Sequence, residues 1–130
     1  MAREFLGQLT VDERLRCFDL GALRMCEPGA SVAEAGAEIN ALYVILSGTA
    51  TVIARDGRVI AQRGAGEILG EVSLLDHRGA SATVRAETKL SLLVLSSGAV
   101  DELIDQHPNT AARFYKSVAM ALGHRLRAAS

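Results

Sequence analysis

Cysteine is scarce in this sequence, and its two copies, Cys17 and Cys26, exclude several classes of small protein. Two cysteines are too few for a disulfide-stabilised scaffold, and they have neither the C-x-x-C spacing of a redox site nor partners for a zinc site. We expect both to be half-buried thiols without a chemical role.

The chain also lacks a long hydrophobic run and an excess of charge of either sign. No apolar segment approaches the roughly 18–20 residues of a membrane span, and residues 1–10 include Arg3 and Glu4 with no long apolar stretch behind them. The formal net charge of −1 gives no reason to expect nucleic-acid binding through a basic surface. These absences predict a cytoplasmic protein without a membrane span.

Motifs for catalysis are missing as well. The three histidines, His77, His107 and His124, are scattered and form neither an H-x-H nor an H-E-x-x-H metal-binding motif. There is no G-x-S-x-G nucleophile elbow, and Asp76 beside His77 is best interpreted as a surface loop pair. We therefore expect neither an enzyme nor a bound metal ion or cofactor.

The length and composition favour one hydrophobic core. A chain of 130 residues with 49% apolar and 22% charged residues is an ordinary globular sequence. Two domains of half this length would each be marginally stable. We predict a single domain over residues 1–130.

Helix signals lie near both ends of the chain. Thr10 and Glu13 form a capping-box pattern, which predicts a short amphipathic helix to about Leu20. Leu15, Cys17 and Phe18 give this helix its apolar side. After residues 96–97 the pattern is helical again, with a break at Pro108 and a final helix over about 109–128. Asp101 and Glu102 are expected in the first turn of the helix before the break. The final helix carries an apolar stripe made of Tyr115, Val118, Leu122 and Leu126. It also carries four basic residues, Arg113, Lys116, Arg125 and Arg127.

These basic residues have two interpretations. A basic amphipathic helix suits a membrane surface or an acidic partner, whereas cations near a helix C-terminus also simply favour the helix dipole.

Short apolar segments separated by turn residues fill the middle of the chain. We predict strands over 42–46, 49–54, 59–62, 81–86 and 90–95, and a short helical turn over 72–75. Asp56 and Gly57 suit a tight hairpin turn, and Pro28, Gly29 and Gly36 mark further turns. Short strands at even spacing indicate an antiparallel barrel or sandwich, because a doubly wound fold would alternate strand and helix throughout.

The glycine-rich segment 64–71 is the main candidate for ligand chemistry. Its third glycine is one position too late for a dinucleotide-binding fingerprint, and no long crossover helix follows. Gly70 followed by the free amides of 71–74 would instead make a cradle for a phosphate group. The alternative is that these glycines only form tight turns.

This segment resembles the phosphate-binding cassette of cyclic-nucleotide-binding domains. The resemblance covers residues 66–76 and 80–84, and it extends to Pro28-Gly29, Gly36, residues 41–48 and the helix near Phe114. It implies a mainly β fold with flanking helices: an antiparallel β jelly-roll barrel over about 25–96, a short N-terminal helix and two C-terminal helices. In that family the last helix is the lid over the base and a dimer contact.

The resemblance also implies roles for individual residues. Glu71 would accept a hydrogen bond from the ribose 2′-hydroxyl, while Gly70 and the amides of Val72 and Ser73 would hold the cyclic phosphate. Ser81 and Thr83 would flank the phosphate or the base.

One departure from the family pattern stands at Ala80, where the pattern has an arginine that pairs with the phosphate. Arg78 either reaches the same phosphate through a rebuilt loop or is a solvated loop charge. Arg85 should share the face of Thr83 and points either at the pocket or outward to solvent. Phe114 or Tyr115 would suit stacking on a purine.

We therefore expect a regulatory module for signal transduction that binds cAMP or cGMP and relays occupancy through its C-terminal helix to a partner or to a second copy of itself. The alternative is a degenerate domain, without nucleotide, that acts in protein interaction or dimerisation. A transcription regulator of the catabolite-activator type would carry a helix-turn-helix after the long helix; this sequence stops at Ser130, so we expect no DNA binding by the chain as given.

Overall fold

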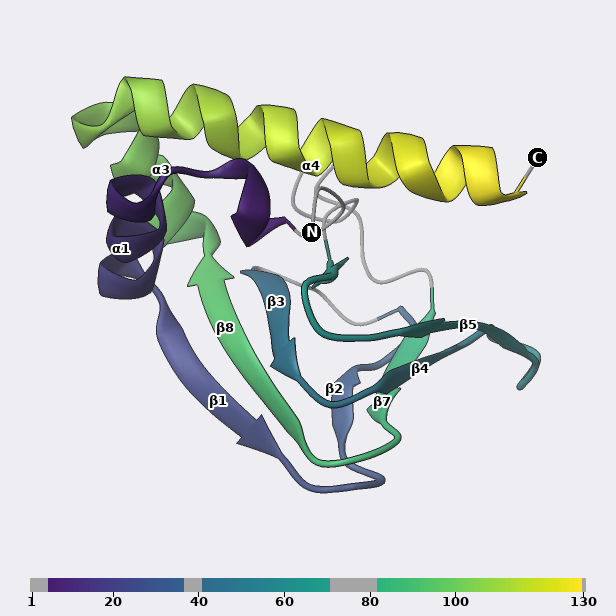
Figure 1. The fold of residues 1–130 in the computed structure, drawn as a ribbon. Helices are drawn as coiled ribbons and strands as arrows, with labels where there is room; N and C mark the ends of the chain where they lie inside the picture. The colour runs from purple at the N-terminus through teal and green to yellow at the C-terminus, as the bar shows by residue number, and fades with distance from the viewer. Residues whose placement is uncertain (1–4, 37–40, 71–81, 130) are drawn as a thin grey trace.

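The computed structural model describes residues 5–36, 41–70 and 82–129, with side chains as far as Arg127. It contains two four-stranded antiparallel sheets with helices gathered at one end (Figure 1). The expected mainly β jelly-roll fold with flanking helices is confirmed, but the two sheets do not close into a barrel.

The first sheet has the strand order β1-β8-β3-β6 and the second has the order β2-β7-β4-β5. The strands of the first sheet are β1 (Ala22–Cys26), β8 (Leu90–Ser96), β3 (Ala41–Ser47) and β6 (Ile68–Leu69). Those of the second are β2 (Ser31–Ala33), β7 (Thr83–Ala86), β4 (Ala50–Ile53) and β5 (Val59–Arg63). The five predicted strands correspond to β3, β4, β5, β7 and β8. The other three were not predicted, because β2 and β6 are very short and β1 has no clear periodicity.

The first sheet is the middle layer of the molecule. One of its faces packs against the second sheet through residues such as Ile45 and Leu92, and the other packs against the helices through Val44 and Leu93. Strands buried on both faces need apolar residues at consecutive positions. This explains why β3 and β8 are the most continuously apolar segments of the sequence.

The hairpin β4–β5 forms as predicted. Its turn is closed by the Ala54 amide, which donates to the Arg58 carbonyl at 2.8 Å, and by the Asp56 carboxylate, which accepts from the Arg58 amide at 3.0 Å. Gly57 takes the positive φ of 88° that the predicted turn requires.

The N-terminal helix α1 (Val11–Leu20) has the predicted capping box but not the predicted buried face. Thr10 Oγ1 accepts from the Glu13 amide at 3.2 Å, and the Glu13 carboxylate accepts from the Thr10 amide at 2.9 Å. Leu15 and Phe18, however, are exposed, whereas Glu13 and Cys17 are buried. The expectation that Leu15 and Phe18 pack inward is therefore wrong.

Contacts with the C-terminal helix explain this orientation of α1. Glu13 pairs with Arg113 at 3.1 Å, and Arg16 donates to the Thr110 hydroxyl at 2.9 Å. These two long-range interactions turn the polar side of α1 toward the last helix, and its apolar side consequently faces solvent.

The C-terminal helices are α3 (Ser97–Gln106) and α4 (Pro108–Ala129), separated at the predicted break. The Ser96 hydroxyl accepts from the Ala99 amide and caps α3. Because α3 begins at Ser97, Asp101 and Glu102 lie beyond its first turn, contrary to our expectation. A 3-10 turn, η1 (Leu6–Gln8), precedes α1.

The buried face of α4 differs from the predicted stripe. Val118 and Leu122 pack on the core as expected, but Tyr115 is 36% exposed and Leu126 is 71% exposed. The other core positions of the helix are Ala111, Phe114 and Ala121. The buried stripe is therefore rotated by about one residue from the one inferred from hydrophobicity.

Candidate functional site

Most of the predicted phosphate-binding residues lie outside the described part of the chain. These are Glu71, Val72, Ser73, Arg78, Ala80 and Ser81, together with the predicted helical turn over 72–75. The roles predicted for them stay predictions. Gly70, Thr83, Arg85, Phe114 and Tyr115 are described, and the structure places each of them.

Gly70 stands at the end of a short strand that the core holds firmly. Ile68 and Leu69 of β6 are buried and pair with Val44 and Tyr43 of β3. Gly70 follows them with a φ of 82°, in the left-handed region that residues with a Cβ rarely adopt. The glycine at this position therefore meets a real backbone requirement at the start of the predicted cradle.

The turn before β6 is anchored by backbone hydrogen bonds. The amide of Gly66 donates to the Ile45 carbonyl at 2.8 Å, and the amide of Ile45 donates to the Glu67 carbonyl at 2.9 Å. The Phe5 amide donates to the Gly66 carbonyl at 2.9 Å, which ties the N-terminal segment to the same turn. Two distant parts of the chain, around Phe5 and Ile45, thus hold this turn in place.

Thr83 and Arg85 share one face of β7, as the strand period predicts. Val84 and Ala86 point into the core between the sheets, so Thr83 and Arg85 face the other way. The Thr83 hydroxyl accepts from the Ala35 amide at 3.0 Å, and Arg85 is exposed. This placement favours the solvated interpretation of Arg85.

The two aromatic residues proposed for base stacking have different positions. Phe114 is 0% exposed, and its ring packs edge-on against Phe5, with ring centroids 5.3 Å apart. The core encloses the ring of Phe114 in this arrangement, so of the two alternatives Tyr115 is the accessible one, and base stacking stays a prediction. Tyr115 contacts Phe114 edge-on at 5.5 Å and is partly exposed. Burial and the nearby Asp101 raise the pKa of its phenol.

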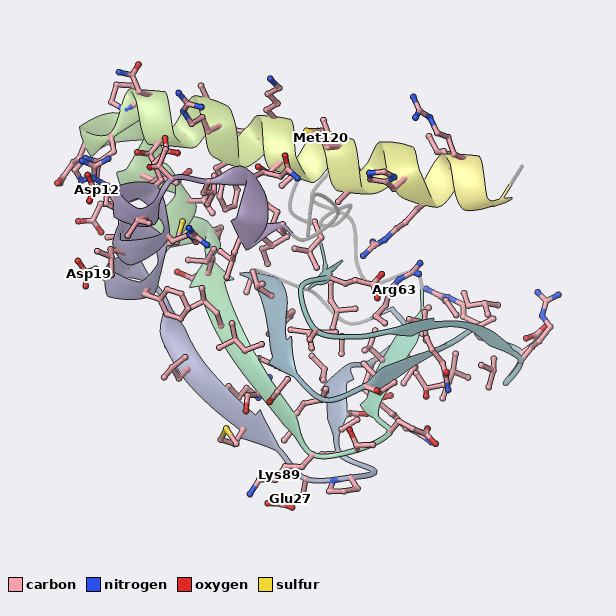
Figure 2. All side chains as sticks on the ribbon, in the orientation of Figure 1. Asp12, Asp19, Glu27, Arg63, Lys89 and Met120 are labelled. Carbon is pink, nitrogen blue, oxygen red and sulfur yellow. The ribbon has the colours of Figure 1, made fainter. Side chains whose placement is uncertain are left out.

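An open groove of about 910 Å³ lies between the β5–β6 segment and the C-terminal half of α4. In Figure 1, α4 extends from α3 across one end of the molecule and passes over β5. The described lining residues are Ile60, Ala61, Arg63, Gly66, Glu67, Ile68, Ala121, His124, Arg125 and Arg127. Figure 2 shows Arg63 on the side of the sheet that faces α4.

The groove is cationic. Arg63 Nη1 lies 3.8 Å from the Glu67 carboxylate, whose other oxygen accepts from the Gly64 amide at 2.7 Å. Arg125 donates to the Ile68 carbonyl and so connects α4 to the strand that leads to Gly70. Burial, and then repulsion from Arg63, lower the pKa of Arg125 to about 10, and attraction to Glu67 opposes this shift in part.

Arg63 and Glu67 were not among the predicted site residues, and Arg125 was predicted only as one of several helix cations. The single local signal is the spacing of four between Arg63 and Glu67. Their meeting with α4 is a long-range contact that no local pattern reveals.

Metal-binding and thiol sites find no support in the described residues. There, no three His, Cys, Asp or Glu residues lie together in a way that could hold a metal ion. Cys17 and Cys26 are free and fully buried rather than half-buried. Burial, together with the Glu13 carboxylate, raises the pKa of Cys17 to about 11. None of the described helices is long and apolar enough to cross a membrane.

Comparison with known proteins points to one family. A model of the cyclic nucleotide-binding domain matches residues 23–107, well over half of the chain. Glutaminase 2 of Bradyrhizobium diazoefficiens is 34% identical over 125 residues, which are 96% of this chain and 20% of that protein. The cAMP-dependent protein kinase regulatory subunit of Yarrowia lipolytica is 33% identical over 100 residues, covering 76% of this chain and 27% of that subunit.

Solved structures agree with the sequence comparisons. A cyclic nucleotide-binding domain from Methylobacillus flagellatus superposes with a TM-score of 0.87 at 25% identity, covering 92% of this chain and 69% of that one. The chain spans only about a fifth to a quarter of the length of the two curated relatives.

Proposed function

Because the chain belongs to the cyclic nucleotide-binding domain family, we propose that it is a cytoplasmic regulatory module that binds cAMP or cGMP and relays occupancy through α4. The observation that carries this proposal is Gly70, held at positive φ by a buried strand at the start of the cassette. Closely approaching backbone and successive free amides are what a singly charged cyclic phosphate requires.

Ala80, in place of the family's arginine, weakens the expected affinity, but the predicted backbone cradle does not need that side chain. A charge-assisted hydrogen bond contributes about 1.5–3 kcal/mol, or roughly ten- to a hundredfold in affinity. Backbone amides at a helix N-terminus still attract an anion when that side chain is missing. The proposed domain is therefore a sensor of moderate affinity.

Contacts of α4 support the relay. Arg125 on α4 hydrogen-bonds the Ile68 carbonyl, two residues before Gly70, while Phe114 packs in the core against Phe5. A ligand that shifts the backbone around Gly70 thereby acts directly on a contact of α4. The relatives contain such segments within longer chains, so we propose that the domain regulates an attached enzyme or a kinase partner.

Thermal unfolding tests the binding step. Ligand at a hundred times its dissociation constant adds about 2.7 kcal/mol to the free energy of unfolding, or roughly 10 °C for a domain of this size. We expect such a rise with about 1 mM cAMP or cGMP as a rough working concentration, and none with the matching 5′-monophosphate. A melting temperature that neither cyclic nucleotide changes would contradict the proposal.

Hydrogen exchange tests the relay. Saturating nucleotide should change the protection of amides in α4 as well as near Gly70. Changes confined to the surroundings of Gly70 would leave a binding domain without a relay through this helix.

Ala80 itself favours the second candidate, a degenerate domain that serves in protein interaction or dimerisation. The variant Ala80→Arg separates the two functions. Tighter nucleotide binding by this variant would indicate a working pocket in the natural chain, whereas no binding by either form would favour the degenerate domain.

A further inference from the structure

Helix α1 turns an apolar stripe away from the core. Val11, Leu15 and Phe18 follow one another at spacings of four and three, which place them along one side of the helix. They are 65%, 57% and 39% exposed, whereas Glu13 and Cys17 on the opposite side are buried. Large apolar residues at these spacings are typical of a helix that packs against a second helix.

Strand β1 adds to this apolar surface. Leu23 and Met25 are 70% and 58% exposed. Leu23 pairs in register with Leu93, which packs against the helices, so Leu23 and Met25 lie on the face of the first sheet that carries α1. In Figure 1, β1 runs on directly from the end of α1. Together the five side chains make a patch of about 300–600 Å², the size at which an apolar patch marks a site of protein contact.

The charges beside the stripe indicate what covers it. Arg14 borders the stripe on one side, and Asp12 and Asp19 border it on the other, because the helix has about 3.6 residues per turn. Figure 2 shows Asp12 and Asp19 on the outer side of α1. Within the part of the chain that the structure describes, neither Arg14 nor Asp19 forms an ion pair.

These positions match the heptad pattern of a parallel helix pair. Val11 and Phe18 take position d and Leu15 takes position a, with Arg14 at position g and Asp19 at position e. In a parallel pair, position g of one helix lies beside the following position e of the other. Arg14 would therefore meet Asp19 of a second copy, and twofold symmetry would form this pair twice. An antiparallel pair would instead set Arg14 against Arg14.

We propose that α1 and β1 form a contact surface for a second copy of this domain, in which the two α1 helices lie side by side and parallel. The apolar stripe forms the seam, and the two Arg14–Asp19 pairs fix the direction of the helices. This surface is separate from α4, the dimer contact that the family resemblance implies. The proposal does not depend on nucleotide binding.

The size of the patch limits the strength of this dimer. Stable interfaces bury about 800 Å² on each partner, and weak ones less than about 600 Å². We therefore expect a dissociation constant of roughly 10–100 µM. At about 1 µM the domain is then a monomer whose stripe is uncovered, so urea unfolding at that concentration shows whether each variant folds.

Sedimentation equilibrium between about 1 µM and about 1 mM measures the dimer. Leu15→Ser and Phe18→Ser should each weaken it at least about tenfold, because each removes an apolar side chain from both copies. Val59→Ser changes an exposed apolar residue of β5 and is the matched control, which should leave the dimer unchanged. A domain that is still monomeric at about 1 mM, or a dimer that Leu126→Ser disrupts and Leu15→Ser does not, would overturn the proposal.

Charge reversal tests the parallel arrangement. Arg14→Glu and Asp19→Arg each place like charges opposite one another, so each should weaken the dimer roughly tenfold. The double variant Arg14→Glu/Asp19→Arg restores both pairs with their signs exchanged and should regain the natural affinity. Single variants that associate as tightly as the natural domain, or a double variant that stays weak, would overturn the arrangement. Neither measurement uses nucleotide, so these outcomes are independent of the proposed sensor function.

Discussion

Arg113 of α4 forms an ion pair with Glu13 of α1, with 3.1 Å between Nε and Oε2, and only 8% of the Glu13 side chain is exposed. The same carboxylate caps the start of α1 by accepting from the Thr10 amide. One buried side chain thus completes a local capping box and also joins the first helix to the last.

Replacing this carboxylate should destabilise the protein. Glu13→Ala removes half of the capping box and leaves Arg113 without this partner, so we expect a loss of about 1–3 kcal/mol in the free energy of unfolding. Asp12→Ala, in the same first turn but exposed, should cost only about 0.5 kcal/mol. Urea unfolding measures both, and equal losses would show that the buried pair contributes nothing beyond the helix dipole.

Phe114 should prove to be a stability residue and not a ligand contact. Its ring is fully buried against Phe5, so Phe114→Ala should cost about 3–5 kcal/mol. Leu126→Ala, on the same helix but exposed, should change stability by less than about 0.5 kcal/mol. A Phe114→Leu variant with native stability but much weaker nucleotide binding would instead restore the stacking role.

The exposed apolar stripe of α1 should tolerate polar residues. Val11, Leu15 and Phe18 lie on its outer side, so Leu15→Ser and Phe18→Ser should each change the unfolding free energy by about 0.5 kcal/mol or less. Leu9→Ser, which places a hydroxyl in the core beside the start of this helix, should cost at least about 2 kcal/mol. Large losses in the two helix variants would mean that the stripe is covered in solution.

Replacement by alanine should be harmful at Gly70 and tolerated at Gly64. Gly70→Ala places a Cβ at a φ of 82°, which costs about 1–2 kcal/mol of strain, and it should weaken nucleotide binding about tenfold. A Cβ at Gly64 would meet open space, and Gly64 has no positive φ, so Gly64→Ala is the matched control. Thermal unfolding measures the loss of stability, and calorimetry measures the loss of nucleotide affinity. Identical behaviour of the two variants would show that Gly70 does not contribute to the predicted cradle.

The buried thiol of Cys17 should make the protein less stable at high pH. Burial and Glu13 raise its pKa from 9.0 to about 11, so the folded state retains a proton that the unfolded state loses between those values. The stabilisation is complete below about pH 9 and is lost as the pH rises toward 11, by up to about 2 kcal/mol.

The contribution of the Cys17 thiol is isolated by comparing the Cys26→Ala protein with the Cys17→Ala/Cys26→Ala protein. Their unfolding curves are measured from about pH 8 to about pH 11. The difference in stability between the two proteins should shrink as the pH rises. In the Cys26→Ala protein, a thiol reagent at about pH 8 should react slowly with the native state and rapidly in urea. A constant difference across the pH range would contradict the shift.

Signals that act over three or four residues were readable in the sequence. The Thr10–Glu13 capping box, the Asp56–Gly57 turn and the helix break at Pro108 all appear where they were expected, because each depends on neighbouring residues alone. The central strands were also predicted, since burial on both faces demands continuous apolar runs. These local signals alone left a choice between a barrel and a sandwich. The family resemblance then predicted the jelly-roll arrangement.

Only the tertiary structure decided which face each helix buries. The exposed stripe of α1 and the rotated stripe of α4 follow from contacts such as Glu13 with Arg113, between residues far apart in the sequence. The groove depends on the same kind of contact, since Arg125 reaches a carbonyl 57 positions away. Hydrophobic periodicity shows that a helix has an apolar side, but its orientation depends on the sum of its long-range contacts. In this protein, polar contacts with α4 orient α1 so that its apolar side faces solvent.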